Sequence, residues 1–222
     1  MASTLQTVYD RLFDAFGPQN WWPGETPFEI MVGAVLVQNT AWKNVEKAIR
    51  NLADRDLLDP LALNEVSAEE LEELIRPAGY YRVKTKRLRC LVRFVVERYD
   101  GDLDAMFSTG LASLREELLS LNGIGPETAD SILLYAGGLP TFVVDTYTHR
   151  ILARHGWIGF DAGYYEIKDH FEGGLVEDVR LYNEFHALLV RTGHLYCRRR
   201  PKCAACPLVD LLPEGGVREP DF

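Results

Sequence analysis

Three of the four cysteines in this 222-residue chain fall within one short segment near its end, at Cys197, Cys203 and Cys206. Thiolates at such close spacing are typical of metal chemistry in a reducing compartment rather than of a disulfide framework. The fourth cysteine, Cys90, lies far away in an apolar helical pattern, and we expect it to be a buried small apolar residue.

A second candidate site is the segment Gly123-Ile124-Gly125, which stands between two expected helices. Glycine permits positive φ and leaves backbone N–H groups uncovered. At the start of the following helix, opened by Pro126, these groups favour an anion such as phosphate. A plain helix–helix turn would explain the same residues.

A carboxylate follows the β-branched run Val143-Val144. Asp145 is placed to cap a helix that continues through Arg154 and ends at Gly156. Capping alone accounts for this residue type, so the chemistry of Asp145 depends on its context.

The elements that must position these residues are almost all helical, which predicts an all-α fold. Leu5, Val8, Leu12 and Phe16 share one face of a helix. Thr26 with Glu29 forms a capping box, and Ser67 and Ser113 are expected to open two further helices in the same way. Apolar periodicity and these signals predict further helices over residues 26–37, 83–99, 126–135, 145–154 and 181–192.

The net charge of −9 argues against a generic nucleic-acid binder, but its distribution permits a local basic face. The stretch 82–93 holds six basic residues and no acid, and a second basic run covers residues 198–202. Solvated helix faces would give the same pattern. No apolar run is long enough for a membrane helix, and the first residues lack the features of a signal peptide, so a cytoplasmic location is the default expectation.

The stretch LNGIGPETADSILLYAGGLPTFVVDTYTHRILARHGW, residues 121–157, resembles the helix-hairpin-helix, Gly/Pro-rich, Asp superfamily of DNA glycosylases, which includes endonuclease III. The resemblance covers nearly the whole chain and implies a fold of two helical lobes with a DNA-binding cleft between them. We expect the protein to be a monomer. A six-helix lobe with the hairpin would cover residues 25–139. Residues 1–24 and 140–222 would form the other lobe, with the cysteine loop at 197–212.

The resemblance also implies that Asp145 is the catalytic acid. Cleavage of a glycosidic bond develops oxocarbenium character on the sugar, which an adjacent carboxylate can stabilise. The same carboxylate can orient or deprotonate a water molecule.

One departure from the superfamily concerns the residue after the hairpin. Bifunctional members carry a lysine there, which attacks the sugar and leads to strand cleavage through a Schiff base. This chain has Glu127 at that position, and a carboxylate cannot form a Schiff base. A monofunctional glycosylase without AP lyase activity is therefore implied.

The segments WWP, QNT and RPAGYY are similar to the 3-methyladenine DNA glycosylase branch of the superfamily. By that resemblance Trp22 and Trp42 are candidates for the two sides of a base pocket. Gln38 would fill the gap left by the flipped nucleotide, and Tyr80 would be a wedge on the opposite strand. The remaining expected DNA contacts are Lys84 and Lys86, on phosphates, and the hairpin residues Gly123, Ile124, Gly125 and Glu127.

The cysteine segment resembles the iron–sulfur loop of endonuclease III, whose spacing is C-x6-C-x2-C-x5-C. Here the first interval is five residues, and Leu212 stands where the fourth cysteine belongs. A [4Fe–4S] cluster normally uses four thiolates. With Cys197, Cys203 and Cys206 alone, a cluster would take an outside ligand, lose an iron or be absent. Zinc held by these cysteines and His194 is an alternative.

We therefore expect a monofunctional DNA N-glycosylase of base excision repair. This hydrolase of N-glycosyl bonds would release alkylated purines such as 3-methyladenine from double-stranded DNA that contains a damaged base. A pyrimidine or mismatch glycosylase of the endonuclease III family is the nearest alternative. A DNA-binding module without catalysis, in which Asp145 only caps its helix, is the alternative from another class.

Overall fold

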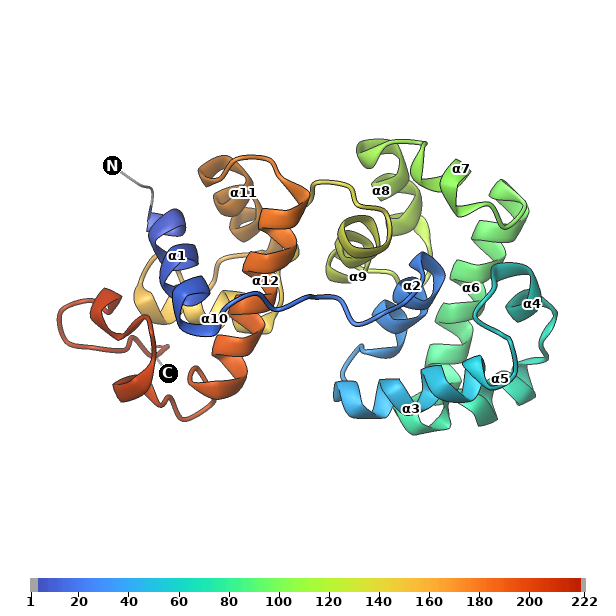
Figure 1. Cartoon of the computed structure of the whole chain (residues 1–222), viewed down its shortest axis with the longest axis horizontal. Helices are drawn as coiled ribbons and strands as arrows, with labels where there is room; N and C mark the ends of the chain where they lie inside the picture. The colour runs from blue at the N-terminus through green and yellow to red at the C-terminus, as the bar shows by residue number, and fades with distance from the viewer. Residues whose placement is uncertain (1–3, 221–222) are drawn as a thin grey trace. The chain divides into compact units, whose positions relative to one another are not determined.

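The computed structural model describes residues 4–220, and these residues form helices and loops without a β-strand. The expected all-α fold is confirmed. The chain divides into two compact units, which Figure 1 shows with their helices labelled. One unit, here the terminal unit, holds residues up to Trp21 and from Pro140 onward, and the other, the central unit, holds Trp22–Leu139. No helix within residues 4–220 is long and apolar enough to cross a membrane.

In the terminal unit, α12 packs against both α10 and α1 (Figure 1). Its core joins the apolar face of α1, with Leu5, Val8 and Leu12 buried, to Phe171 and Phe185 from later helices. The four α-helices of this unit are α1 (Thr4–Phe16), α10 (Thr146–His155), α11 (Tyr164–Gly174) and α12 (Val179–Leu195). Two short 3-10 turns, η3 (Cys203–Ala205) and η4 (Val209–Leu211), lie in the cysteine segment.

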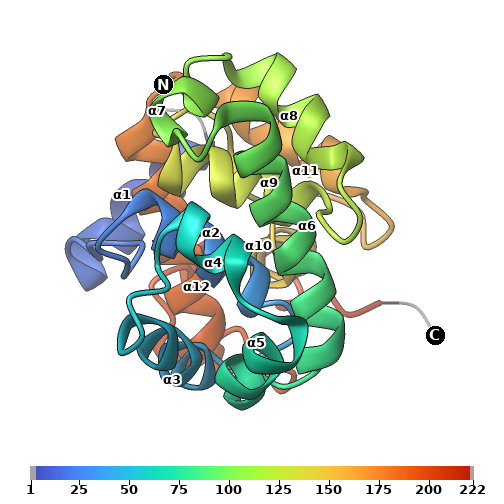
Figure 2. The ribbon, with the colours of Figure 1, turned by 90° about the vertical axis from the view of Figure 1, so that its right-hand side faces the viewer.

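The central unit is built around α2, in which Phe28 and the six residues from Met31 to Leu36 are buried. The long α6 lies beside α4 and α5, as Figure 2 shows. Its α-helices are α2 (Pro27–Leu36), α3 (Trp42–Ala53), α4 (Pro60–Glu65), α5 (Ala68–Ile75), α6 (Tyr81–Tyr99), α7 (Leu103–Phe107), α8 (Leu111–Ser120) and α9 (Pro126–Ser131). Two shorter turns are η1 (Arg76–Ala78) and η2 (Ile132–Ala136). Residues 22–139 thus hold more α-helices than the expected six, because α4 and α7 are too short to show an amphipathic period.

Two of the three expected capping boxes are confirmed by their hydrogen bonds. The Thr26 side chain accepts from the Glu29 amide, and the Ser67 side chain accepts from the Glu70 amide. The expected start at Ser113 is wrong. There α8 begins at Leu111, because Gly110, with φ of 92°, turns the chain three residues before Ser113.

The helix expected over residues 126–135 forms with a change of winding. After α9, the chain continues as η2, a π-helical turn in which the Gly137 amide donates to the Ile132 carbonyl over 3.0 Å. Four residues of this turn, Ile132 to Tyr135, are buried. Pi-helical turns often occur at functional sites.

Candidate functional site

Asp145 caps α10 and is held by two hydrogen bonds to one of its oxygens. Its Oδ1 accepts from the Thr148 amide at 2.7 Å and from the Thr148 hydroxyl at 2.8 Å. The buried run Phe142–Val144 anchors the chain directly before it. The Asp145 side chain keeps 12% of its surface exposed. The carboxylate is thus fixed in one orientation while its second oxygen, Oδ2, takes no part in the cap.

The second oxygen of Asp145 faces α12. Its Oδ2 lies 3.8 Å from Nε2 of His186, a side chain with only 6% of its surface exposed. Burial lowers the pKa of the His186 imidazole, and the opposing effect of Asp145 is smaller. At neutral pH this contact therefore joins a carboxyl group to a neutral imidazole rather than forming an ion pair. The sequence contains no local signal for this contact, because His186 lies on a helix far along the chain.

A buried polar cluster supports the segment that leads to Asp145. The Lys168 ammonium donates to the Thr141 hydroxyl and to Glu172, and Glu172 also accepts from the Phe142 amide at 2.8 Å. The Phe142 ring stacks on Phe171 with centroids 3.9 Å apart. These contacts hold residues 141–142 against α11. The sequence analysis missed this cluster, and its one signal was the i,i+4 spacing of Lys168 and Glu172.

The hairpin lies in the central unit, and only one of its two glycine positions requires a glycine. Gly123 has φ of 88°, and a Cβ there would overlap the side chain of Arg87. Gly125 is extended, with φ of −93° and open space around its Cα. Ile124 is buried and anchors the hairpin between them, whereas Glu127 is exposed in the first turn of α9. The hairpin therefore presents Gly125 and Glu127 to solvent.

Gln38 connects the loop after α2 to the hairpin. Its amide nitrogen donates to the Gly123 carbonyl at 3.1 Å and to the Thr128 hydroxyl at 2.9 Å. Its amide oxygen accepts from Arg87 of α6. Gln38 and the hairpin, two of the segments expected to contact DNA, thus lie side by side.

Tyr80 protrudes from the turn before α6. It adopts the left-handed conformation, with φ of 45°, and 73% of its surface is exposed. A bulky residue in this conformation is a genuine outlier. The turn therefore projects an aromatic side chain into solvent, as a wedge would require.

Lys84 is the clearest correction to the expected DNA contacts. Its side chain is buried, and its ammonium donates to the Leu36 carbonyl, the Thr40 hydroxyl and the Ala78 carbonyl at 2.6–2.8 Å. Burial, with a smaller contribution from the charge of Arg87, lowers the pKa of Lys84 to about 8. All three protons of the ammonium are used inside the unit, so Lys84 cannot contact a phosphate. Lys86, by contrast, is exposed.

The aromatic pair also differs from the expected arrangement. The Trp22 and Trp42 rings meet edge to face, with centroids 5.1 Å apart and planes at 87°. Both rings lie 3.4–3.5 Å from the place where a Cβ on Gly33 would stand. Tyr135, which the sequence analysis missed, lies 5.2 Å from Trp22 at 33°. In this structure the two tryptophans therefore form a packed cluster and not two parallel walls.

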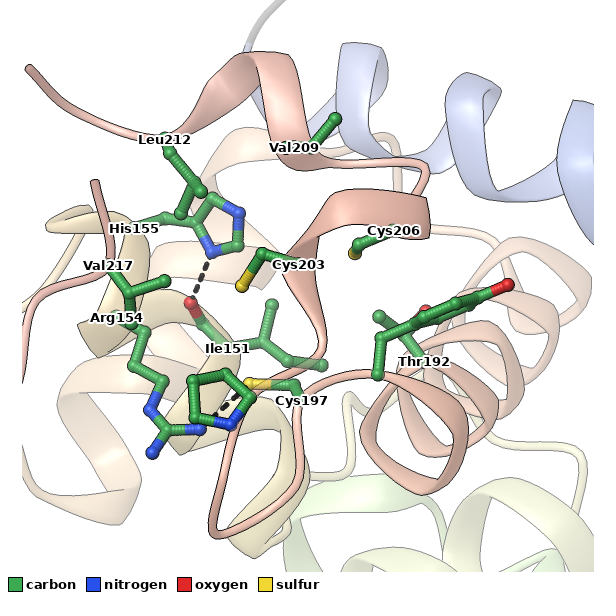
Figure 3. A pocket seen from close by; sticks show the side chains of 12 residues that line it. Ile151, Arg154, His155, Thr192, Cys197, Cys203, Cys206, Val209, Leu212 and Val217 are labelled. Atoms are coloured by element: carbon green, nitrogen blue, oxygen red, sulfur yellow. Dashed lines mark hydrogen bonds between the residues drawn. The ribbon is translucent and has the colours of Figure 1, made fainter.

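The three clustered cysteines line one pocket of the terminal unit, together with Leu212 (Figure 3). Yet no group of three or more His, Cys, Asp or Glu side chains among residues 4–220 is arranged to hold a metal ion. Burial raises the pKa of the Cys203 and Cys206 thiols, which favours their neutral form. The three thiols, with apolar Leu212 at the fourth position, do not make up the four-thiolate ligand set that a [4Fe–4S] cluster normally uses.

Other contacts hold this segment. The buried Arg154 guanidinium donates to the carbonyls of Arg198 and Arg199, pairs with Glu219 at 3.1 Å, and lies 3.7 Å from Cys197 Sγ (Figure 3). The His194 ring packs on Tyr147 with centroids 4.8 Å apart, which gives the zinc alternative no support. Arg154 thus links α10 to the cysteine loop.

Cys90 corrects a further expectation. It lies on α6 in the central unit, is partly exposed, and lines a shallow surface groove with Lys86, Arg89 and Arg93. Its side chain is therefore not part of the core.

Known proteins that match this chain in sequence and in its helical fold are DNA glycosylases. A family model described as HhH-GPD superfamily base excision DNA repair protein matches residues 32–175. A Methanocaldococcus jannaschii protein described as a DNA repair glycosylase is 50% identical over 209 residues, 93% of this chain and 94% of its own length. Endonuclease III of Thermotoga maritima is 32% identical and covers 81% of this chain and 79% of its own.

Two solved structures extend these similarities. A trapped covalent intermediate of endonuclease III with DNA has a TM-score of 0.80 at 26% identity and covers 96% of this chain and 97% of its own. The 3-methyladenine DNA glycosylase of Helicobacter pylori, bound to 1,N6-ethenoadenine, has a TM-score of 0.73 at 30% identity and covers 86% and 94%. The chain belongs to the HhH-GPD superfamily of base excision DNA repair proteins, and it is a DNA glycosylase of the endonuclease III-like kind.

Proposed function

We propose that this protein is a monofunctional DNA glycosylase that releases alkylated purines such as 3-methyladenine from double-stranded DNA. The observation that carries the catalytic part is the fixed carboxylate of Asp145, which has one oxygen in the helix cap and the other outside it. That second oxygen can face positive charge that develops on a sugar.

The reaction follows from this placement. The N-glycosidic bond breaks, and its electron pair leaves with the base. A purine alkylated at N3 or N7 carries a positive charge, so it departs as a neutral molecule and needs little help from a general acid. Asp145 stabilises the oxocarbenium ion and orients the water whose oxygen bonds to C1′. The proton of that water passes to the carboxylate and then to solvent.

The absence of lyase activity rests on the residue after the hairpin. Glu127 stands in the first turn of α9, and Lys84, one of the two lysines expected to contact DNA, is buried in three hydrogen bonds. Glu127 has no amine, and the amine of Lys84 is not accessible for attack on C1′. The strand would therefore stay intact after base release.

The aromatic cluster of the central unit supports the substrate class. Trp42 and Trp22 are both partly exposed, and the Trp22 ring also contacts the rings of Trp42 and Tyr135. An extrahelical base would stack on one exposed aromatic face, and a cationic base adds a cation–π attraction. The similarity to the Helicobacter pylori enzyme, whose name states 3-methyladenine, favours the same substrate here.

Contacts to duplex DNA would come from the hairpin around Gly123 and Gly125, from Gln38, and from the exposed side chains of Tyr80 and Lys86. Hairpin amides and Lys86 suit phosphates, and the exposed Tyr80 suits insertion into the stack. Gln38 would first have to exchange its bonds to Gly123, Thr128 and Arg87 for bonds in the duplex. We propose that one chain, as a monomer, carries out the reaction.

Mass analysis of the bases released from methylated duplex DNA tests the proposal directly. We expect 3-methyladenine from the wild-type protein and none from Asp145→Asn, with no strand breaks before alkali. Release of oxidised or mismatched pyrimidines instead would favour the second candidate, which the similarity to endonuclease III supports. DNA binding without release of any base would favour the third candidate, a DNA-binding module without catalysis.

A further inference from the structure

Two loops of the central unit meet at a single buried ammonium group. One loop, residues 37–41, follows α2 and carries Gln38, and the other, residues 79–80, lies between η1 and α6 and carries Tyr80. Lys84 donates to the Leu36 carbonyl at 2.8 Å, at the start of the first loop. It donates at 2.7 Å to the carbonyl of Ala78, the last residue of η1, directly before the second loop.

The third bond of the Lys84 ammonium closes this arrangement. It goes to the Thr40 hydroxyl at 2.6 Å, and that hydroxyl donates in turn to the Ala78 carbonyl at 2.6 Å. An ammonium has three donors and no acceptor, so its hydrogen-bonding capacity is fully used. The two loops also approach closely, since a Cβ on Gly79 would lie 3.9 Å from the Thr40 hydroxyl.

Both loops hold residues in a conformation that costs energy. Asn39 has φ of 54° and Tyr80 has φ of 45°, both in the left-handed region without being glycine. Such conformations persist only where the surroundings over-determine them. Because the Lys84 bonds end one residue from Asn39 and two residues from Tyr80, they are placed to hold both turns.

We propose that Lys84 is a positioning residue that holds the Gln38 loop and the Tyr80 loop in a fixed relation, so that Tyr80 enters the duplex at a set position relative to Gln38 and the hairpin when a base is flipped. This inference rests on the proposed function, in which Gln38 and Tyr80 contact DNA. Lys84 itself touches neither the base nor a phosphate.

The first test needs no substrate. Hydrogen exchange of the free, full-length protein should become faster in residues 37–41 and 78–81 of Lys84→Met, which keeps the volume and removes the donors. Lys86→Met, a matched change at an exposed lysine of the same helix, should leave exchange in both loops unchanged. Thr40→Val removes one hydroxyl from the cluster and should speed exchange in both loops, even if Lys84→Met fails to fold. Unchanged exchange in folded Lys84→Met would overturn the proposal. If Lys84→Met does not fold, unchanged exchange in Thr40→Val would overturn it.

The second test separates positioning from general stability. Base release from methylated duplex DNA should fall in Lys84→Met on the order of ten- to a hundredfold, as expected for misplaced insertion groups. Release from the same strand without its complement should fall much less, because no stack must be opened. The rate of base release in the double variant Lys84→Met, Tyr80→Ala should fall by less than the product of the two single losses.

Equal losses of rate on both substrates, or fully multiplicative losses in the double variant, would refute the positioning role. If wild-type protein releases no base at all, the proposed function fails, while the exchange result still decides whether Lys84 joins the loops.

Discussion

Replacing Asp145 by asparagine separates the two tasks of this side chain. The asparagine Oδ1 can still accept from the Thr148 amide and hydroxyl, which Asp145 Oδ1 holds at 2.7 and 2.8 Å. Asparagine and aspartate are comparable as helix caps, so the fold should lose on the order of 0.5 kcal/mol or less. The second oxygen becomes an amide, and the negative charge that would face the sugar is lost.

The expected loss of rate is much larger than the loss of stability. Removing one preorganised electrostatic contact from a transition state costs roughly 2.7–4 kcal/mol, about a hundred- to a thousandfold in rate. Affinity for damaged duplex DNA should change little, because phosphate contacts supply most of it. Single-turnover release of 3-methyladenine and an unfolding titration measure the two effects separately.

The matched control is Asp178→Asn, at another aspartate cap of the same unit. The Asp178 side chain accepts from the Leu181 amide at 2.7 Å at the start of α12, and it is exposed. This variant should lose as little stability as Asp145→Asn and keep full turnover. Wild-type turnover in Asp145→Asn, or an equal loss of turnover in both variants, would refute the assignment of Asp145 as the catalytic carboxylate.

Three other outcomes are expected from the arrangement of the sites. Borohydride should trap no covalent adduct with DNA, because Glu127 replaces the amine; a trapped adduct would show that another lysine reacts. Trp42→Ala should reduce base release by an amount corresponding to roughly 1–3 kcal/mol of lost stacking while leaving undamaged duplex binding nearly unchanged; equal losses would indicate a packing role alone. Because the pKa of Lys84 is lowered from 10.5 to about 8, the unfolded chain holds this proton more tightly than the folded protein does. The Lys84 contribution to the free energy of unfolding should therefore rise between pH 8 and 10.5, and Lys84→Met should lack that rise in chemical denaturation; parallel pH profiles would contradict this.

A fourth expectation concerns iron. Aerobically purified protein should contain substoichiometric iron, and any absorbance near ~400 nm should bleach on standing, since Leu212 cannot ligate and three thiolates hold a cluster incompletely. Metal analysis and the visible spectrum measure this, with Leu212→Cys as the comparison. A stoichiometric, air-stable cluster in the wild-type protein would require a fourth ligand from elsewhere in the chain.

Helix starts and stops were readable from the sequence because their causes are local. The caps at Thr26 and Ser67 depend on a side chain and an amide three residues apart, and the stop at Gly156 depends on one left-handed residue. Ser113 shows the limit of this approach, since the same pattern lies inside α8 once Gly110 turns the chain earlier.

The sequence by itself determined which chemistry is available: a carboxylate at Asp145, no amine at Glu127, and no fourth thiol at Leu212. Residue identity alone decides whether a group can carry charge, form a Schiff base or bind iron. Only the tertiary structure decided where long side chains go. Lys84 and Lys86 stand two positions apart in one basic run, yet one ammonium is buried and the other side chain is exposed. That difference arises because the acceptors of Lys84 come from Leu36, Thr40 and Ala78, which lie 6–48 residues away and meet only when the helices pack.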